Sequence, residues 1–273
     1  MGFFLLLLSC TGEVEVPSDP VCNGHAELCA RPLDQVVFPA THNSMSSAAD
    51  DWQLPNQPDG IRAQLDAGIR GMLLDTYLWK GEYYFCHAYC ELGATPMSEG
   101  LGDIRDFLAE NPEEVIVIIF QDDISGEQTQ EAFEEAGLDS EVYTWTLGAW
   151  PTLGELVANK QRLLITAEVG GPPPAWYQPA WELFSDTPYS FSSTEEFSCE
   201  LNRGALENPL FLLNHWVEYP FPSEELSAQA NAYDMLMSRA EDCRVQRQLP
   251  NLVAVDMYRT GDLFAVVEAL NGF

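Results

Sequence analysis

Basic residues are scarce in this chain. Lysine and arginine together number 12 against 43 aspartates and glutamates, which gives a formal net charge of −31. A surface of this sign repels the phosphates of nucleic acids and of anionic membranes, so a nucleic-acid partner is excluded. The same charge would suit a bound divalent cation, although a solvated acidic face that keeps the protein soluble is the simpler interpretation.

Two short motifs are also missing. No Cys-x-x-Cys pair occurs, which argues against a structural zinc site. No glycine-rich phosphate loop follows the first apolar run, which argues against a doubly wound dinucleotide-type sheet. What the chain does have is 273 residues with 46% hydrophobic content, enough for one large domain with a substantial core.

The N-terminal residues resemble an export signal. Residues 1–9 are largely apolar, and Leu7-Leu-Ser-Cys10 resembles a bacterial lipobox, whose cysteine becomes lipidated after cleavage. Residues 11–20 are acidic and contain proline, which is typical of a flexible tether. We therefore expect a signal and tether in residues 1–20, one domain in residues 21–273, and an exported monomer, secreted or anchored to the membrane of a bacterial envelope at Cys10.

Cysteine usage supports export. Six cysteines remain after Cys10: Cys22 and Cys29 flank one short loop, Cys86 and Cys90 flank another, and Cys199 and Cys243 remain. An even number of cysteines in an exported chain predicts three disulfides and an oxidising compartment.

Apolar runs alternate with amphipathic segments along the chain. We expect strands at residues 36–41, 71–77, 83–88, 115–120, 162–167, 209–213 and 252–255, and helices at residues 61–68, 101–110, 125–136, 152–160, 223–248 and 262–271. Most of these strands are continuously apolar, which is typical of a parallel sheet buried on both faces. About seven strand–helix units in a single domain predict an α/β fold of the TIM-barrel type.

Polar residues follow the predicted strands at their carboxyl ends, which open onto one face of a parallel barrel. The residues expected there are His42, Asp75, His87, Gln121, Asp122, Glu168, Asn214, His215 and Asp256. Polar residues also simply mark where strands meet solvent, but that interpretation explains poorly why three of the chain's four histidines lie at strand ends. Two facing histidines suit acid–base cleavage of a phosphodiester, with a metal ion or an arginine offsetting the phosphoryl charge.

Six ordered motifs make the resemblance specific. The chain resembles the phosphatidylinositol-specific phospholipase C superfamily, a set of distorted TIM barrels, from Pro32 to the C-terminus, and it is most similar to secreted bacterial and fungal members. The motifs are residues 41–44, 68–75, 86–88, 115–122, 212–216 and 253–256.

The resemblance implies a role for each matching residue. His42 resembles the general base, His87 the general acid, and Asp256 the carboxylate that orients the base. Asn43 and Asp75 resemble metal ligands of the calcium-dependent members. The resemblance therefore implies a divalent cation, Ca²⁺ or Mg²⁺, held by Asn43, Asp75, Gln121 and Asp122, and a phosphodiester or phospholipid head group as substrate.

Departures from the family pattern keep other interpretations open. Leu73 stands where calcium-dependent members have a carboxylate, Gln121 replaces a glutamate, and Glu168 stands where a basic residue would help. Candidate substrate-binding residues are Arg70, Asn214 and His215, although Arg70 also suits pairing with a barrel carboxylate. The alternatives are a glycerophosphodiester phosphodiesterase, against which Asn43-Ser44 argues, and a catalytically decayed lipoprotein that binds a head group.

Overall fold

The computed structural model describes residues 20–273. The predicted signal and the lipobox Cys10 lie outside these residues. The strands are β1 (Phe38–Thr41), β2 (Gly71–Trp79), β3 (Glu82–Cys86), β4 (Ala94–Pro96), β5 (Ile116–Asp122), β6 (Val142–Tyr143), β7 (Leu163–Ala167), β8 (Gln178–Pro179), β9 (Phe184–Asp186), β10 (Leu210–Asn214) and β11 (Leu252–Val255).

The α-helices are α1 (Ile61–Asp66), α2 (Met97–Glu110), α3 (Gly126–Ala136), α4 (Leu153–Ala158), α5 (Ala180–Leu183), α6 (Glu224–Ala230), α7 (Tyr233–Gln246) and α8 (Leu263–Asn271). Short 3₁₀ helices are η1 (Ala26–Ala30), η2 (Leu33–Gln35), η3 (Asp139–Glu141) and η4 (Thr194–Glu196). Within residues 20–273, every helix is too short or too polar to cross a bilayer.

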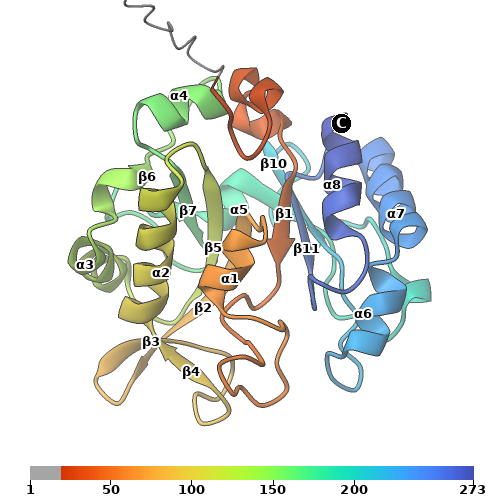
Figure 1. Cartoon of the computed structure of the whole chain (residues 1–273), viewed down its shortest axis with the longest axis horizontal. Helices are drawn as coiled ribbons and strands as arrows, with labels where there is room; N and C mark the ends of the chain where they lie inside the picture. The colour runs from red at the N-terminus through yellow and green to blue at the C-terminus, as the bar shows by residue number, and fades with distance from the viewer. Residues whose placement is uncertain (1–19) are drawn as a thin grey trace, which may run out of the picture.

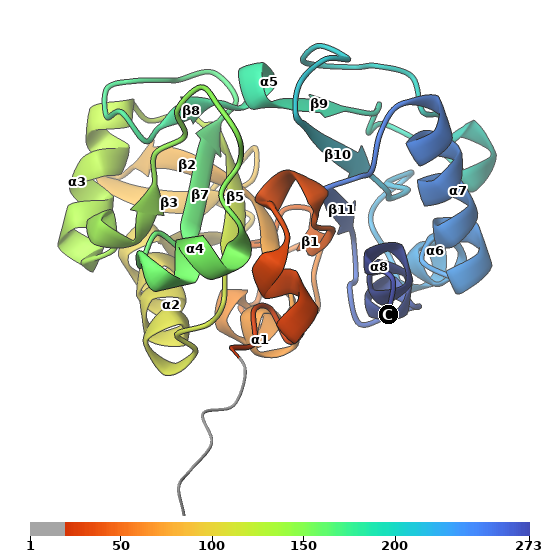
Figure 2. The same ribbon diagram turned by 90° about the horizontal axis from the view of Figure 1, so that it is seen from above.

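The sheet curls into a distorted barrel. Its strands follow the order β6-β7-β5-β2-β1-β11-β10-β9, with parallel neighbours throughout this path. The first and last strands in the chain, β1 and β11, therefore pair directly. The two ends of the strand path, β6 and β9, do not pair; β8, which pairs with β7, and α5 lie between β7 and β9 (Figure 2). Helices α2 and α3 cover one side and α6, α7 and α8 cover the other (Figures 1 and 2). The predicted distorted TIM barrel is confirmed.

The barrel strands are buried on both faces. In β5, Val117 and Ile119 belong to the core inside the barrel, whereas Ile116, Ile118 and Phe120 belong to the core between the sheet and the helices. This alternation follows from the two-residue period of a strand. The alternation of side chains continues past the end of each strand. It therefore decides which polar residue at the rim faces the barrel interior.

Three expectations differ from the structure. Residues 83–88 form no barrel strand, because β3 runs antiparallel to β2 as a hairpin that continues into β4. Helix 223–248 is two helices, because the Asn231 side chain leaves the helix to donate hydrogen bonds to the carbonyls of Asp256 and Thr260. Strands β4, β6, β8 and β9 and helix α5 were not expected, because elements of two to four residues carry too little periodicity to be recognised.

Three disulfides are present, as the cysteine count predicts: Cys22–Cys29, Cys86–Cys90 and Cys199–Cys243. The last closes by far the longest loop, with a sequence separation of 44. Replacing Cys199 and Cys243 with alanine should lower the free energy of unfolding by about 4 kcal/mol, because the unfolded chain regains the entropy of an open loop. Urea denaturation measures this loss. A loss no larger than that from removing Cys22–Cys29, about 2 kcal/mol, would contradict it.

Candidate active site

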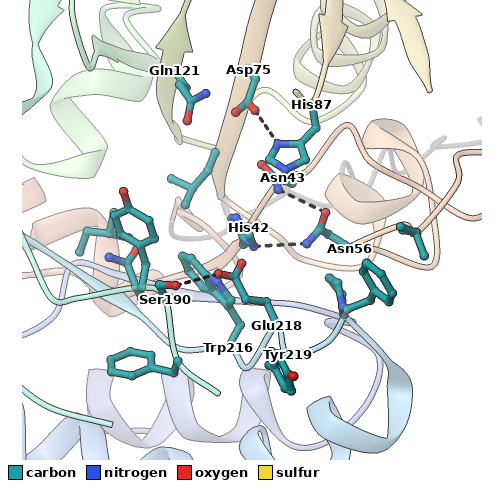
Figure 3. A pocket seen from close by; sticks show the side chains of 18 of the residues that line it. His42, Asn43, Asn56, Asp75, His87, Gln121, Ser190, Trp216, Glu218 and Tyr219 are labelled. Carbon is teal, nitrogen blue, oxygen red and sulfur yellow. Dashed lines mark hydrogen bonds and ion pairs between the residues drawn. The ribbon is translucent and has the colours of Figure 1, made fainter. Parts of the chain in front are cut away.

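A cavity of about 510 Å³ opens at the carboxyl ends of the barrel strands. Its lining includes two of the three histidines expected at the rim and most of the expected oxygen donors (Figure 3). The members from the sequence prediction are His42, Asn43, Asp75, His87, Gln121, Glu168 and Asn214. Asp256 lies beneath this surface, against His42.

The end of β1 places His42. Its backbone N–H donates to the carbonyl of Val255, and its own carbonyl accepts from Gln57 Nε2 at 2.7 Å. The next residue, Asn43, has φ of 43°, a left-handed conformation that asparagine tolerates better than most residues. The His42 ring stacks on Trp216 with 3.8 Å between the ring centres. The imidazole is thus fixed by backbone and ring contacts together.

Strand register brings Asp256 to His42. Thr41 pairs with Val255 in the parallel ladder of β1 and β11, so the next residues of the two strands lie side by side. His42 Nδ1 lies 2.9 Å from Asp256 Oδ1, and the carboxylate is only 1% exposed. Asn56 Nδ2 donates to the same oxygen at 3.1 Å. The carboxylate therefore favours the tautomer with a proton on Nδ1 and leaves Nε2 toward the cavity.

His87 forms a second imidazole–carboxylate pair. Its Nδ1 lies 2.9 Å from Asp75 Oδ2, and the two side chains are 49% and 5% exposed. The hydrogen bond to Asp75, helped by the charge of that carboxylate, raises the pKa of His87 against the opposing effect of burial. Near neutral pH the ring is therefore protonated to a greater extent than a free histidine, as a general acid requires.

Three oxygen-bearing side chains lie close to these rings. Asp75 and Gln121 pair in the parallel register of β2 and β5, and both line the cavity with Asn43. Asn43 Nδ2 donates to Asn56 Oδ1 at 3.2 Å, which leaves the Asn43 carbonyl oxygen as an acceptor. One carboxylate and two amide oxygens are hard donors of the kind that Ca²⁺ and Mg²⁺ take. The chemical type of these three oxygen donors therefore fits a bound Ca²⁺ or Mg²⁺. Among residues 20–273, however, no three His, Cys, Asp or Glu side chains group as metal ligands.

Asp122 does not join this group, contrary to the sequence prediction. Its two carboxylate oxygens accept the backbone N–H groups of Val169 and Gly170, each at 2.8 Å. The side chain therefore shapes the loop after β7. Asp122 follows Gln121 directly, and the strand alternation turns the two side chains to opposite faces.

His215 is also misplaced by the sequence prediction. It is fully buried outside the barrel, where Nε2 donates to the carbonyl of Ala230 at 2.8 Å and Nδ1 accepts from Arg239 at 3.2 Å. Asn214, one residue earlier, faces the cavity as expected. Its Nδ2 donates to Asp186 at 3.1 Å and to the carbonyl of Thr187 at 2.6 Å.

Burial should make His215 a source of acid sensitivity. Burial, followed by the charge of Arg239, lowers the pKa of His215 from 6.5 to about 3. Between these values only the unfolded chain binds the proton, so stability falls as pH decreases below about 6.5. The wild type should lose about 2 kcal/mol of unfolding free energy by pH 5 relative to His215→Gln. Urea denaturation of both proteins from pH 7 to pH 5 measures this difference, and parallel pH slopes would contradict it.

Arg70 lies at the opposite end of the barrel, so its prediction as a substrate-binding residue is wrong. It precedes β2, where its Nε donates to Glu114 at 2.6 Å and its Nη1 donates to the carbonyls of Leu65 and Ile69. The alternative prediction, pairing with a carboxylate of the barrel, describes the observed contact.

The sequence prediction missed Arg203, which is the one lysine or arginine lining the cavity in the described part of the chain. Its Nη1 donates to Glu168 at 2.8 Å and its Nη2 to the fully buried Asp186 at 2.6 Å. The guanidinium carbon also lies 3.9 Å from the centre of the Trp181 ring and 4.7 Å from that of Tyr189. Burial raises the pKa of Glu168, while Arg203 opposes that shift. No local motif marks Arg203, because it lies in an irregular segment between β9 and β10.

Comparison with known sequences identifies the family. The family model described as PI-PLC X 1 matches residues 28–271. PI-PLC X domain-containing protein 1 of Arthroderma benhamiae is 26% identical over 298 residues, which cover 100% of this chain and 96% of that protein. A protein of the same fungus named "Uncharacterized secreted protein" is 27% identical over 285 residues, which cover 92% of this chain. The match spans 64% of the length of that relative.

Solved structures give the same result for the fold. Phosphatidylinositol-specific phospholipase C from Staphylococcus aureus superposes with a TM-score of 0.62 at 11% identity, covering 89% of this chain and 95% of that chain. A second structure of the S. aureus enzyme gives a TM-score of 0.62 at 15% identity. The family match covers nearly all of the described residues, and the distorted barrel agrees with it. This chain is a member of the PI-PLC X family.

Proposed function

We propose that this protein is a phosphoric diester hydrolase or lyase that cleaves a phospholipid-type substrate by acid–base catalysis. One observation carries the proposal. His42 and His87 line the same cavity, and each uses Nδ1 to contact a carboxylate at 2.9 Å. In residues 20–273 neither ring has a hydrogen-bond partner at Nε2, so both nitrogens are available to a substrate between them (Figure 3).

The proposed mechanism assigns one proton transfer to each ring. His42 Nε2 removes the proton from a hydroxyl of the head group, and the resulting oxygen attacks phosphorus. The bond from phosphorus to the lipid oxygen breaks, and His87 Nε2 donates its proton to that leaving oxygen. Asp256 stabilises the imidazolium formed at His42. The raised pKa of His87 supports its role as the acid.

A divalent cation would complete the site. Asn43, Asp75 and Gln121 would hold it through their side-chain oxygens, and it would supply positive charge to the phosphoryl oxygens. Asp75 gives Oδ2 to His87, which leaves Oδ1 as the one carboxylate oxygen of this set. We therefore expect weak affinity for the ion.

The charges of the cavity favour a head group without extra phosphates. Glu168, Asp75 and Glu218 line it, and Arg203 is already paired with Glu168 and Asp186. The hydroxyls of a polyol can donate hydrogen bonds to Glu168 and accept them from Arg203. An added phosphate would instead be repelled by the carboxylates of the cavity. We propose phosphatidylinositol as the test substrate, with its 4,5-bisphosphate turned over at least about tenfold more slowly.

The test is a diesterase assay on the full chain. Phosphatidylinositol in detergent micelles is incubated with excess Ca²⁺, with Mg²⁺ or with a chelator, and phosphorus NMR follows the products. We expect release of a water-soluble head-group phosphate that is faster with the cation. Turnover of a water-soluble glycerophosphodiester instead would favour the glycerophosphodiesterase alternative. Head-group binding without turnover would favour the decayed binding protein, for which Leu73 and Gln121 are the specific arguments.

Export also belongs to this proposal. One relative is named a secreted protein, and the three disulfides are typical of an oxidising compartment. The reported relatives are fungal and therefore do not support a bacterial lipid anchor. Lipidation of Cys10 stays a prediction.

A further inference from the structure

The two histidines of the site are held in different ways. His42 directly follows β1, a central barrel strand. Its backbone hydrogen-bonds to Val255 and to the Gln57 side chain, and its ring stacks on Trp216. His87 follows the hairpin strand β3, outside the barrel wall, and its side chain is 49% exposed. The ladder of β3 and β4 ends with Cys86 opposite Ala94, so His87 lies beyond the last strand pair.

The turn that carries His87 is short and exposed. Residues 87–89 are all exposed, and Ala88 has φ of 53°. The N–H of Tyr89 donates to the carbonyl of His87, and the N–H of Leu92 donates to the carbonyl of Tyr89. The first bond lies within the turn. The second continues to Leu92, whose carbonyl accepts the N–H of Gln53 in the loop after β1, so neither bond holds His87 to a barrel strand. Exposed turns of this kind open at low cost in free energy.

A disulfide joins the two ends of this turn, with one cysteine on each side of His87 in the sequence. Cys86 and Cys90 are separated by four positions, and their Cα atoms lie 5.0 Å apart. Both belong to the core between the sheet and the helices, at 0% and 8% exposure, so the bond fixes both ends of the turn to packed structure. His87 is the residue next to the first cysteine. Its backbone is therefore restrained by a covalent ring of five residues.

We propose that the Cys86–Cys90 disulfide is a positioning element for catalysis, which holds His87 against Asp75 and in line with His42. The inference rests on the proposed function of His87 as the acid. A misplacement of about 1 Å at a reacting group costs on the order of a hundredfold in rate. By the same loop-entropy argument, a bond that closes so short a loop contributes about 2 kcal/mol to global stability, half of the contribution of Cys199–Cys243. The restraint on His87 is a local effect in addition to this contribution.

The chain offers a matched control for this claim. In one variant, Cys86 and Cys90 become alanine; in the other, Cys199 and Cys243 become alanine. Removing Cys86–Cys90 should lower kcat on phosphatidylinositol by about 100-fold with KM within about threefold, and should lower the melting temperature by only a few degrees. Removing Cys199–Cys243 should lower the melting temperature more and leave kcat near the wild-type value. A kcat within twofold of wild type after removal of Cys86–Cys90 would overturn the proposal.

Two further measurements cover the other outcomes. If the Cys86→Ala, Cys90→Ala protein does not fold, wild-type protein is partially reduced with a phosphine and alkylated, and mass spectrometry maps each opened bond. The loss of activity should correlate with the opening of Cys86–Cys90. A loss that correlates only with the opening of Cys199–Cys243 would overturn the proposal. If the wild type cleaves no phosphodiester, the proposed function fails, and crystal structures decide the positioning claim separately. An unchanged contact between His87 and Asp75 in the variant would refute it.

Discussion

Replacing His42 with alanine is expected to lower kcat/KM on phosphatidylinositol by about 10²- to 10⁴-fold, because the attacking hydroxyl loses its proton acceptor. Steady-state kinetics with saturating Ca²⁺ measure the loss. The ring contacts Asp256 and Trp216 at the cavity rim and is not part of the hydrophobic core. The melting temperature should therefore change by no more than a few degrees, about the effect of a 1 kcal/mol loss in a chain of this size.

His25→Ala is the matched control for this substitution. His25 lies at the other end of the barrel, where its ring stacks on Phe273. This variant should retain wild-type kcat/KM. His87→Ala should show a loss like that of His42→Ala, because each ring performs one of two successive proton transfers. Retained turnover in either the His42 or the His87 variant would refute the acid–base assignment.

The second large effect is expected from Asp256→Asn. Asp256 is buried, and its Oδ1 accepts hydrogen bonds from both His42 and Asn56. The amide keeps the shape of the side chain but removes the charge that stabilises protonated His42, and it offers an N–H donor where an acceptor is needed. We expect kcat/KM to fall by about 10²- to 10⁴-fold.

Asp106→Asn provides the comparison for Asp256→Asn. Asp106 lies on the exposed face of α2, where its carboxylate contacts the neighbouring Arg105. The same chemical change there should leave kcat/KM within twofold of wild type. Near-normal activity of Asp256→Asn would mean that His42 needs no charged partner, and the proposed role of Asp256 would then be wrong.

Much of this site was predictable from local sequence. Apolar runs that end in polar residues mark the strand ends, and parallel strands present those ends at one face. That argument alone placed His42, Asp75, Gln121 and Asn214 at the same cavity. Helices α3 and α4 likewise begin where the sequence predicts helices 125–136 and 152–160, and the structure shows a capping box at Ser125 and at Thr152.

The errors at Asp122 and His215 have one physical cause. Both residues directly follow a correctly predicted neighbour, and a one-residue shift along a strand reverses the face. A strand that is apolar at every position carries no alternation from which its two faces can be told apart. Only the packing of β5 and β10 against the barrel interior decides that Gln121 and Asn214 face inward.

The sequence by itself therefore determined where most strands lie along the chain and which polar residues follow them. It did so because hydrophobic runs and the polar residues that end them are local features. The tertiary structure alone decided the facing of adjacent residues, the pairing of His87 with Asp75, and the position of Arg203 beside Glu168. The two contacts join residues 12 and 35 positions apart, and they depend on how strands pair and loops pack, which no short stretch of sequence encodes.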